Sequence, residues 1–339
     1  MKQSAIRFLL LAFLMAVKTN LYAAIEVDGI SYKIYSTNMT ASVTKGNYKG
    51  VIVIPSTIVY QGNTYSVTTI DVHAFLNCSK VTSLTIGDNV TKISDAAFSG
   101  CGGLTSLTIP NNVTSIGQYA FNGCSSLTSV TIPNSVSYIG YSAFGGCNSL
   151  TFLSINCQVV TTVFRGSPIQ EVVLGRDVEK IANQAFYGCT SLTSINIPNG
   201  VTSIGEYAFA NCSSLTSMTI PNSVTEIGWE AFHNCSSLSS ITIGNGISEI
   251  CYGTFIGCIS LSSLTIGNCV TTIGQRAFEG CASLTSVTIP NSVATIGENA
   301  FQGCTGLSTV TIPNSVITIG EYNQEIKGKT NVEIIPVSA

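Results

Sequence analysis

Charged residues are scarce in this chain of 339 residues: aspartate, glutamate, lysine and arginine together make up 9% of it, while hydrophobic residues make up 45%. A disordered chain has the opposite balance, with much charge and little apolar content, so the sequence predicts a folded protein. Long hydrophobic runs are also missing beyond the first 23 residues. The apolar residues come in short stretches, which argues against a bundle of membrane-spanning helices.

The motifs of catalysis, metal binding and phosphate binding are missing as well. No Cys-x-x-Cys pair, serine-centred nucleophile elbow or phosphate-cradling glycine loop occurs. The two histidines, His73 and His233, lie too far apart in the chain to share a metal ion, and the acidic residues are scattered. We therefore predict that the protein is not an enzyme, has no catalytic residues and no metal site, and uses no cofactor.

The start of the chain carries the one long apolar run. Two basic residues precede ten consecutive apolar ones, Phe8 to Val17, and the small residue Ala23 follows where a cleavage point would lie. This pattern predicts a signal peptide over residues 1–23, which is too short to remain as a membrane-spanning helix. Lys18 stands where such peptides are usually neutral, so a buried N-terminal helix stays open as the alternative.

Removal of this segment would take away three basic residues and no acidic one, which lowers the formal net charge from −3 to −6. Nucleic-acid binding requires clustered lysine and arginine against phosphate, so we expect no nucleic-acid partner. The sequence thus predicts a secreted or cell-surface protein with no integral membrane segment after signal cleavage. It predicts no particular oligomeric state.

A fixed internal period of 23 residues dominates the rest of the chain. Each repeat contains Ala-Phe, once Thr-Phe, and a cysteine three places after the phenylalanine. The ten phenylalanines are Phe75, Phe98, Phe121, Phe144, Phe186, Phe209, Phe232, Phe255, Phe278 and Phe301. The spacing departs from 23 only between Phe144 and Phe186, and the period falls in the range of leucine-rich repeats.

The repeat of residues 127–147 shows how one unit folds. Alternating apolar and polar residues over 127–132 predict a strand with its apolar side inward. A Pro-Asn-Ser turn, a return wall with two apolar residues and a bend at Gly140 follow. The Ala-Phe-x-x-Cys segment then makes a short helical or irregular side.

A single unit cannot bury its own apolar face, so the units must stack and share their burial. We predict an α/β solenoid of about eleven coils over residues 71–320, with a parallel β-sheet on one face and short helical or irregular segments on the other. Residues 24–70 lack the repeat but hold short β-branched runs separated by turns, which predicts an N-terminal β cap. Residues 321–339 lack Ala-Phe-x-x-Cys and are expected to form a degenerate C-terminal cap.

The unit Leu-x-x-Val/Leu-x-Ile-Pro-x-x-Val-x-x-Ile-Gly-x-x-Ala-Phe-x-x-Cys occurs at Leu104 to Cys124 and at Leu284 to Cys304. It closely resembles the leucine-rich repeats of the BspA-like surface proteins, which occur in Bacteroides-type bacteria and other host-associated microbes. The resemblance covers roughly residues 71–320. It implies a curved solenoid, export, and adhesion to host matrix proteins or other cells, and it implies no catalytic residues.

Ten of the thirteen cysteines occupy one inward-facing position of the repeat, from Cys78 to Cys304. Neighbouring strands lie about 4.8 Å apart, which exceeds the ~3.8 Å between the Cβ atoms of a disulfide, so we expect a buried column of free thiols. Such a row offers no four-ligand zinc site. Cys157, Cys251 and Cys269 fall in turns or replace the bend glycine, and both sequence drift and a redox or cross-linking role stay open for them.

The repeat breaks once, near residues 152–173, where Phe164 to Pro168 replaces Ala-Phe-x-x-Cys. Exposed strand positions that carry threonine or serine elsewhere here carry Phe152, Gln170, Glu171 and Val173. Either this coil is a decayed repeat that its neighbours tolerate, or it presents a distinct ligand-binding patch.

Two exposed columns are further binding candidates. Aromatic residues lie one or two places after the bend, at Tyr119, Tyr141, Tyr207, Trp229, Tyr252 and Tyr322. They either offer contact area with a polar handle or pack over the edge of the coil. Threonines line the strand face at Thr108, Thr131, Thr219, Thr242, Thr265, Thr288 and Thr311. They are either ordinary solvent-facing strand residues or a flat array of hydroxyl groups.

These features lead to the hypothesis of a non-catalytic extracellular binding module. It would adhere to a host matrix protein, a cell surface or a glycan through the repeat surface. The alternative is a structural spacer or scaffold of the cell envelope, and the third hypothesis is ice- or glycan-lattice binding by the threonine column.

Overall fold

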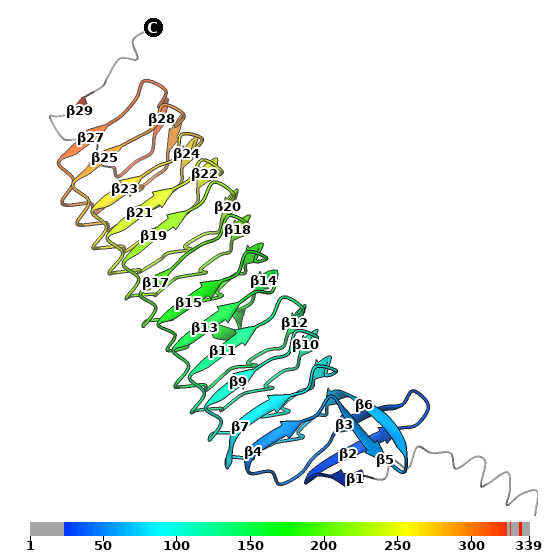
Figure 1. The fold of residues 1–339 in the computed structure, drawn as a ribbon. Coiled ribbons are helices and arrows are strands. Elements are labelled where there is room, and N and C mark those ends of the chain that lie inside the picture. The colour runs from blue at the N-terminus through cyan, green and yellow to red at the C-terminus, as the bar shows by residue number, and fades with distance from the viewer. Residues whose placement is uncertain (1–23, 324–325, 327–331, 334–339) are drawn as a thin grey trace, which may run out of the picture.

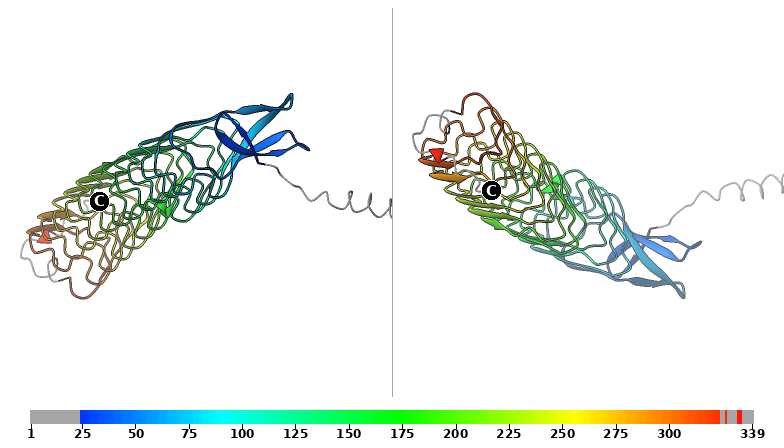
Figure 2. Two further views of the ribbon diagram at one scale, coloured as in Figure 1. Left: turned by 90° about the horizontal axis from the view of Figure 1, so that it is seen from below. Right: turned by 90° about the horizontal axis from the view of Figure 1, so that it is seen from above.

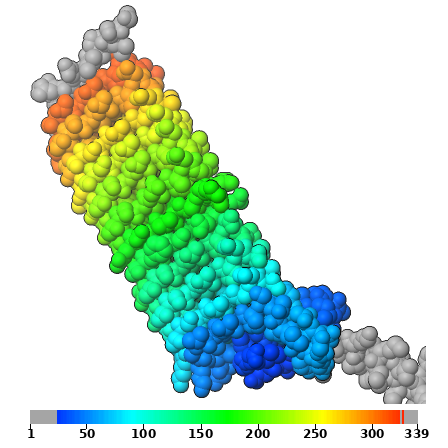
Figure 3. Space-filling view, in the orientation of Figure 1, coloured from blue at the N-terminus to red at the C-terminus, as the bar shows by residue number. Residues whose placement is uncertain are grey.

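The computed structural model describes residues 24–323, 326 and 332–333. The predicted signal peptide, residues 1–23, and most of the expected C-terminal cap lie outside the described residues. The described chain winds into one stack of coils, which runs almost straight in the view of Figure 1 rather than curving as the resemblance implies. Figure 3 shows one continuous surface from the N-terminal segment to the last coil. Over most of the stack, neighbouring coils are hydrogen-bonded on all three sides and so keep a similar spacing all round, which keeps the stack straight.

Each coil contributes one parallel strand to a wall that we call the long-strand wall. Its strands are β4 (Gly50–Ile54), β7 (Val81–Ile86), β9 (Ser106–Thr108), β11 (Ser129–Ile132), β13 (Phe152–Ile155), β15 (Glu171–Leu174), β17 (Ser194–Ile195), β19 (Ser217–Ile220), β21 (Ser240–Ile243), β23 (Ser263–Thr265), β25 (Ser286–Thr288), β27 (Thr309–Thr311) and β29 (Val332–Glu333). Breaks between β17 and β19 and between β23 and β25 divide this wall into three sheets. Along β11, Val130 and Ile132 are buried and Thr131 is exposed, which confirms the predicted alternation.

The return wall of the repeat is itself a parallel sheet, here called the short-strand wall. Its strands are β6 (Asn63–Ile70), β8 (Lys92–Ile93), β10 (Ser115–Ile116), β12 (Tyr138–Ile139), β14 (Val159–Val160), β16 (Lys180–Ile181), β18 (Ser203–Ile204), β20 (Glu226–Ile227), β22 (Glu249–Ile250), β24 (Thr272–Ile273), β26 (Thr295–Ile296) and β28 (Thr318–Ile319). These strands give about twelve turns, one more than expected, because β4 and β6 form a first turn that pairs in parallel with β7 and β8.

The third side of each coil consists of turns, and no α-helix occurs over residues 24–323. Of the two forms predicted for this side, the irregular one is found, apart from one short 3-10 helix in the irregular coil. The backbone N–H of Phe98 donates to the carbonyl of Ala120 in the next coil at 2.7 Å, so it is not available for a bond within its own coil. Two places later Gly100 has a φ of +76°, a left-handed conformation that glycine adopts readily and that ends a helical run.

A ladder of phenylalanine rings fills the core behind these turns. The rings of Phe98 and Phe121, for example, stack with centroids 5.2 Å apart. Beside the ladder, the cysteine thiols donate to the phenylalanine carbonyls of the preceding coil, as from Cys101 Sγ to Phe75 O at 3.2 Å. All thirteen cysteines are free, and the ten of the repeat are buried, which confirms the predicted column of thiols.

The irregular coil keeps its third side although it lacks Ala-Phe-x-x-Cys. The 3-10 helix η1 (Thr162–Phe164) places the Phe164 ring 5.6 Å from the ring of Phe144, so the ladder extends from Phe144 into this coil. Val163 is buried next to it. A shorter coil is compatible with the stack because its apolar residues still reach the shared core.

The N-terminal segment lies at one end of the stack in both views of Figure 2. Its strands β1 (Ala24–Val27), β2 (Ile30–Tyr35) and β3 (Thr40–Val43) pair antiparallel, and β5 (Thr57–Tyr60) pairs antiparallel with β6. The ring of Tyr48 packs 4.3 Å from that of Phe75 and so meets the first ring of the ladder.

At the other end, Asn323 occupies the repeat position of alanine and is fully buried. Its Oδ1 accepts the N–H of Phe301 at 3.0 Å, where Phe278 donates to the backbone carbonyl of Ala300. Its Nδ2 donates to the carbonyl of Gly297 at 2.9 Å. The side-chain amide thus replaces the backbone groups of a further coil.

Candidate functional site

The bend after the short-strand wall brings the backbones of neighbouring coils very close. A β-carbon at Gly228 would lie 2.3 Å from the backbone nitrogen of Glu206. Glycine at this place lets its N–H reach the preceding coil, as from Gly228 to Ile204 O at 2.8 Å. The same bond is made by Gly117, Gly140, Gly205, Gly274, Gly297 and Gly320.

Thr161 and Cys251 carry side chains at this bend. Each is stacked on a preceding coil that has glycine at the bend. In the part of the chain that the structure describes, neither donates the N–H bond that glycine makes there. The short-strand wall is interrupted at the same two points, between β12 and β14 and between β20 and β22. Ser94 and Ala182 also carry a β-carbon at the bend but keep their bonds. Ser94 stacks on the N-terminal turn, and Ala182 stacks on the shortened coil. A β-carbon at the bend, stacked on a coil that has the bend glycine, therefore prevents the hydrogen bond between the two coils at this place.

Between these interruptions, the outer surface of β14 to β20 is hollowed by a groove of about 740 Å³, which we call the bend groove. Its floor includes Ser203 and the backbone of Gly205 and Gly228, and Cys251 closes one end. Its charged lining residues are Lys180, Glu206 and Glu226, and its aromatic lining residue is Trp229.

The structure divides the predicted aromatic column into two groups. Trp229 is 60% exposed in the bend groove, and Tyr207 and Tyr252 lie in the coils on either side of it, both half-buried. The backbone N–H of Tyr207 donates to Trp229 O at 3.0 Å. Tyr119 and Tyr141 form a separate edge-to-face pair with centroids 5.6 Å apart, on the far side of the β12–β14 interruption. Of these residues Trp229 lines the bend groove, and Tyr322, outside both groups, is 60% exposed in the last coil.

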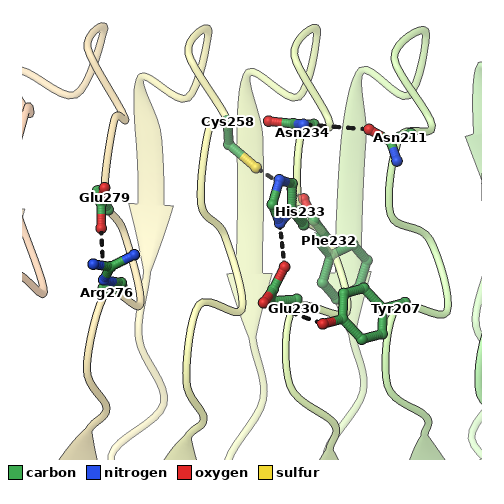
Figure 4. Close-up of polar contacts among 9 residues, drawn as sticks. All are labelled: Tyr207, Asn211, Glu230, Phe232, His233, Asn234, Cys258, Arg276 and Glu279. Atoms are coloured by element: carbon green, nitrogen blue, oxygen red, sulfur yellow. Dashed lines mark hydrogen bonds and ion pairs between the residues drawn. The ribbon is translucent and has the colours of Figure 1, made fainter.

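Figure 4 shows Tyr207, Glu230 and His233 joined across two coils. The hydroxyl of Tyr207 donates to Glu230 Oε1 at 3.2 Å, and Glu230 Oε2 contacts Nδ1 of His233. Burial and then the carboxylate of Glu230 raise the pKa of Tyr207. No group of three or more His, Cys, Asp or Glu residues in the described chain is placed to hold a metal ion. These contacts fix the edge of the coil beside Trp229.

The four candidates of the irregular coil lie on the long-strand wall, away from the bend groove. Phe152 is half-buried and pairs across the sheet with Glu171. Gln170 and Glu171 are exposed, and Val173 is 44% exposed. Glu171 and Val173 line a shallow depression of about 380 Å³ that extends to β19. The structure thus brings the four residues together, but into a site separate from the aromatic column.

The threonine column is exposed on the long-strand wall but is not continuous. Ser154, Val173 and Asn196 take the threonine position on β13, β15 and after β17. In the neighbouring column the hydroxyls are engaged, as in Thr128 Oγ1, which donates to Thr105 O of the preceding coil at 3.2 Å. The free hydroxyls therefore form two shorter rows.

The three cysteines outside the column differ in accessibility. Cys157 is buried, and its thiol donates to Val159 O at 3.5 Å, so it is not the exposed residue that its turn position suggests. Cys251 is half-buried and Cys269 is exposed. Burial and the carboxylates of Glu249 and Glu226 raise the pKa of Cys251 to about 11. The observed effect of Cys251 is on shape, because it interrupts the short-strand wall.

Lys180 is a charged groove residue that sequence reasoning missed. Lys180 is the one lysine on the described short strands after β8, and it pairs in register with Ser203. The signal that could have located the groove is the bend glycine column, which is replaced at Thr161 and Cys251.

A 23-residue period, two parallel walls and a buried phenylalanine ladder define a leucine-rich repeat β-solenoid with almost no helix. The chain belongs to the BspA-type leucine-rich repeat family, since the model described as BspA type leucine rich repeat region (6 copies) matches residues 62–163, 158–284 and 271–335. The predicted family is thereby confirmed.

Two solved structures illustrate the similarity. A leucine-rich repeat protein from Bacteroides ovatus is 29% identical, with a TM-score of 0.58 over 87% of this chain and 90% of that one. A leucine rich cell surface protein from Faecalibacterium prausnitzii is 30% identical, with a TM-score of 0.44 over 85% of this chain and 94% of that one. The comparison with curated proteins gives no match.

Proposed function

We propose that this protein is an exported, non-catalytic binding module that adheres to a host matrix protein, a cell surface or a glycan through its repeat surface. The observation that carries the proposal is the bend groove with Trp229 exposed in it. Tryptophan contributes much contact area and is enriched among the residues that dominate binding energy at interfaces. Lys180 and Glu226 of the groove lie two strand spacings apart, about 10 Å, which is too far for them to act as a hydrogen-bonded acid–base pair and favours binding over catalysis.

Export is supported by the predicted signal peptide and by membership of a family of surface proteins. None of the helices in the part of the chain that the structure describes is long and apolar enough to span a membrane. Residues 24–70 serve as the N-terminal cap in this proposal, since Tyr48 covers the first ring of the core.

The alternative function, a spacer or scaffold of the cell envelope, is supported by the straight stack and its hydrogen bonds between coils. A rod of this kind holds its two ends at a fixed separation. Lattice binding by the threonine column has less support, because Val173 and Asn196 interrupt the row.

The experiment that tests adhesion uses the mature protein, residues 24–339, on immobilised host matrix proteins, on host cells and on glycan arrays. We expect saturable binding that is lost in a variant carrying Phe152→Ala, Glu171→Ala and Trp229→Ala. All three side chains are at least partly exposed, so the variant should remain folded, which circular dichroism checks. Absence of binding to every host fraction would leave the spacer function.

A further inference from the structure

The charges of the bend groove are separated along its length. Lys180, Ser203 and Glu226 pair in register on successive strands and face outward, so Lys180 and Glu226 lie two strand spacings apart, about 10 Å. The small side chain of Ser203 leaves the space between them open. The groove is therefore positive at its β16 end and negative at its β20 end.

Two carboxylates, those of Glu206 and Glu226, line the groove together with Trp229. Glu226 and Glu249 act electrostatically on the thiol of Cys251, and Glu206 and Glu230 act on the hydroxyl of Tyr207. Both of these groups belong to coils adjacent to that of Trp229 in the stack. Glu230 is engaged by Tyr207 and His233, whereas Glu206 and Glu226 are exposed in the groove without a cationic partner among the described residues.

An exposed indole beside unpaired carboxylates favours a cation. The ring face attracts a guanidinium or ammonium group, and the carboxylates add Coulomb attraction. The protein makes the same type of contact internally, where the guanidinium of Arg165 lies 4.4 Å from the ring centroid of Tyr187. At Trp229 the aromatic face is present but the cation is not part of the described chain.

The shape of the groove suits an extended chain more than a single side chain. It runs across four strands, from Val159 on β14 to Cys251. At the Cys251 end, the carbonyls of Thr225 and Ile227 lack the backbone donors that their equivalents in regular coils have. An extended segment lying along the groove crosses the strands, so its polar groups can donate to these carbonyls at that end without adding a strand to the wall.

We propose that the bend groove binds an extended segment of a partner protein, which places an arginine or lysine on Trp229 between Glu206 and Glu226 and an acidic residue near Lys180. This inference rests on the proposed adhesive function and specifies the chemistry of the partner. The partner is a protein segment because the separated charges of the groove match a chain that carries charges of both signs, which a neutral glycan does not.

The test measures binding of a short fluorescent peptide rich in arginine and glycine, with its glutamate and glycine counterpart as the charge control. We expect the arginine peptide to bind and the glutamate peptide not to bind. Trp229→Ala should weaken binding about tenfold or more, as loss of a cation–π anchor would. The matched control is Tyr141→Ala, which removes an aromatic residue 70% exposed at the same repeat position outside the groove and should leave binding unchanged.

A second pair of variants separates the groove from general surface charge. Glu206→Gln with Glu226→Gln should weaken binding of the arginine peptide and reduce its dependence on salt. The control variant is Glu298→Gln with Glu321→Gln, which changes the net charge by the same amount. Both glutamates occupy the repeat position of Glu206 but lie outside the groove, so this variant should have no effect on binding. Lys180→Glu should strengthen binding.

Equal losses in the two glutamate pairs would show unspecific attraction and overturn the proposal. So would a glycan ligand that Trp229→Ala abolishes while the arginine peptide binds no better than the glutamate peptide. If the mature protein adheres to host fractions but the groove variants and peptides have no effect, adhesion stands and this inference fails. If the peptides behave as expected but no host fraction binds, the groove assignment stands and adhesion fails.

Discussion

The regular coils from Gly274 to Gly320 and the grooved coils from Thr161 to Cys251 share one interior but differ outside. The rings of Phe278 and Phe301 stack at 5.3 Å, and those of Phe209 and Phe232 stack at 5.2 Å. On the short-strand wall, however, the regular coils are uninterrupted from β22 to β28, whereas the grooved coils end in a break on each side. A uniform core therefore does not require a uniform surface.

The outward residues of the same wall follow this difference. The regular coils present Thr272, Thr295 and Thr318 in one row, which is ordinary strand composition. The grooved coils present Lys180, Ser203 and Glu226. The two breaks at the bend thus flank the coils whose outward strand positions carry Lys180 and Glu226.

The largest predicted effect concerns the thiol column, which both regions share. Burial raises the pKa of Cys189 and of Cys235 to about 12 in the grooved coils, and burial raises that of Cys258 well above its usual range at the edge of the regular coils. Because the folded pKa exceeds the unfolded value of about 8.5, the stabilisation is complete below that pH and is lost as pH rises toward 12.

Each buried thiol lowers the free energy of unfolding by about 1.4 kcal/mol per pH unit in that range. We therefore expect steep alkaline unfolding, followed by circular dichroism between about pH 9 and 12. Cys235→Ala and Cys258→Ala should reduce the slope equally if the two regions share one core. A free energy of unfolding that does not fall between about pH 9 and 12 would contradict the buried column of thiols.

The next effect concerns the ring ladder. Phe209→Ala in the grooved coils and Phe278→Ala in the regular coils should each lower the free energy of unfolding by about 3–5 kcal/mol, because both rings are fully buried. Urea unfolding measures both, with Tyr141→Ala as the exposed aromatic control. A much smaller loss for Phe209→Ala would mean that the open surface loosens the core beneath it.

Most of this fold follows from local sequence rules. The 23-residue period identifies the stack, and the alternation around Val130 and Ile132 identifies the inward side of the long-strand wall. The turns of the third side could not be told from helix by apolar spacing, because hydrogen bonds between coils decide them. Phe164 was likewise recognisable as a ladder member only once η1 placed its ring.

The candidate site was predictable only in part. Trp229 stands out in sequence as a large aromatic residue at an outward position. The groove beside it depends on a contact between a β-carbon at position 251 and the backbone of another coil, which exists only when the coils are stacked. Cys251 therefore suggested redox chemistry in sequence, although its visible consequence is the gap in the wall.

A smaller effect on stability is expected when the bend residue of one region is exchanged for that of the other. Cys251→Gly should let the N–H at position 251 reach Ile227 O, join β20 to β22 and raise stability by about 1 kcal/mol. Gly297→Ala should do the reverse in the regular coils, because its β-carbon would lie 2.5 Å from the backbone nitrogen of Gln275. Hydrogen exchange of the amides at positions 251 and 297 measures both changes. Unchanged protection in both variants would remove the β-carbon as the cause of the break.

The smallest effect leaves stability untouched and separates Cys251 from Cys269, the two cysteines outside the column that are not buried, by their labelling rates. In native protein the exposed Cys269 should react with a thiol reagent first. Cys251 should follow slowly, at a rate that rises about tenfold per pH unit, because its pKa of about 11 leaves little thiolate near neutral pH. Cys269→Ser should remove the fast phase and Cys251→Ser the slow one. Rapid labelling of ten or more cysteines would mean that solvent reaches the core from both regions alike, and the contrast between a shared closed interior and a locally opened surface would fail.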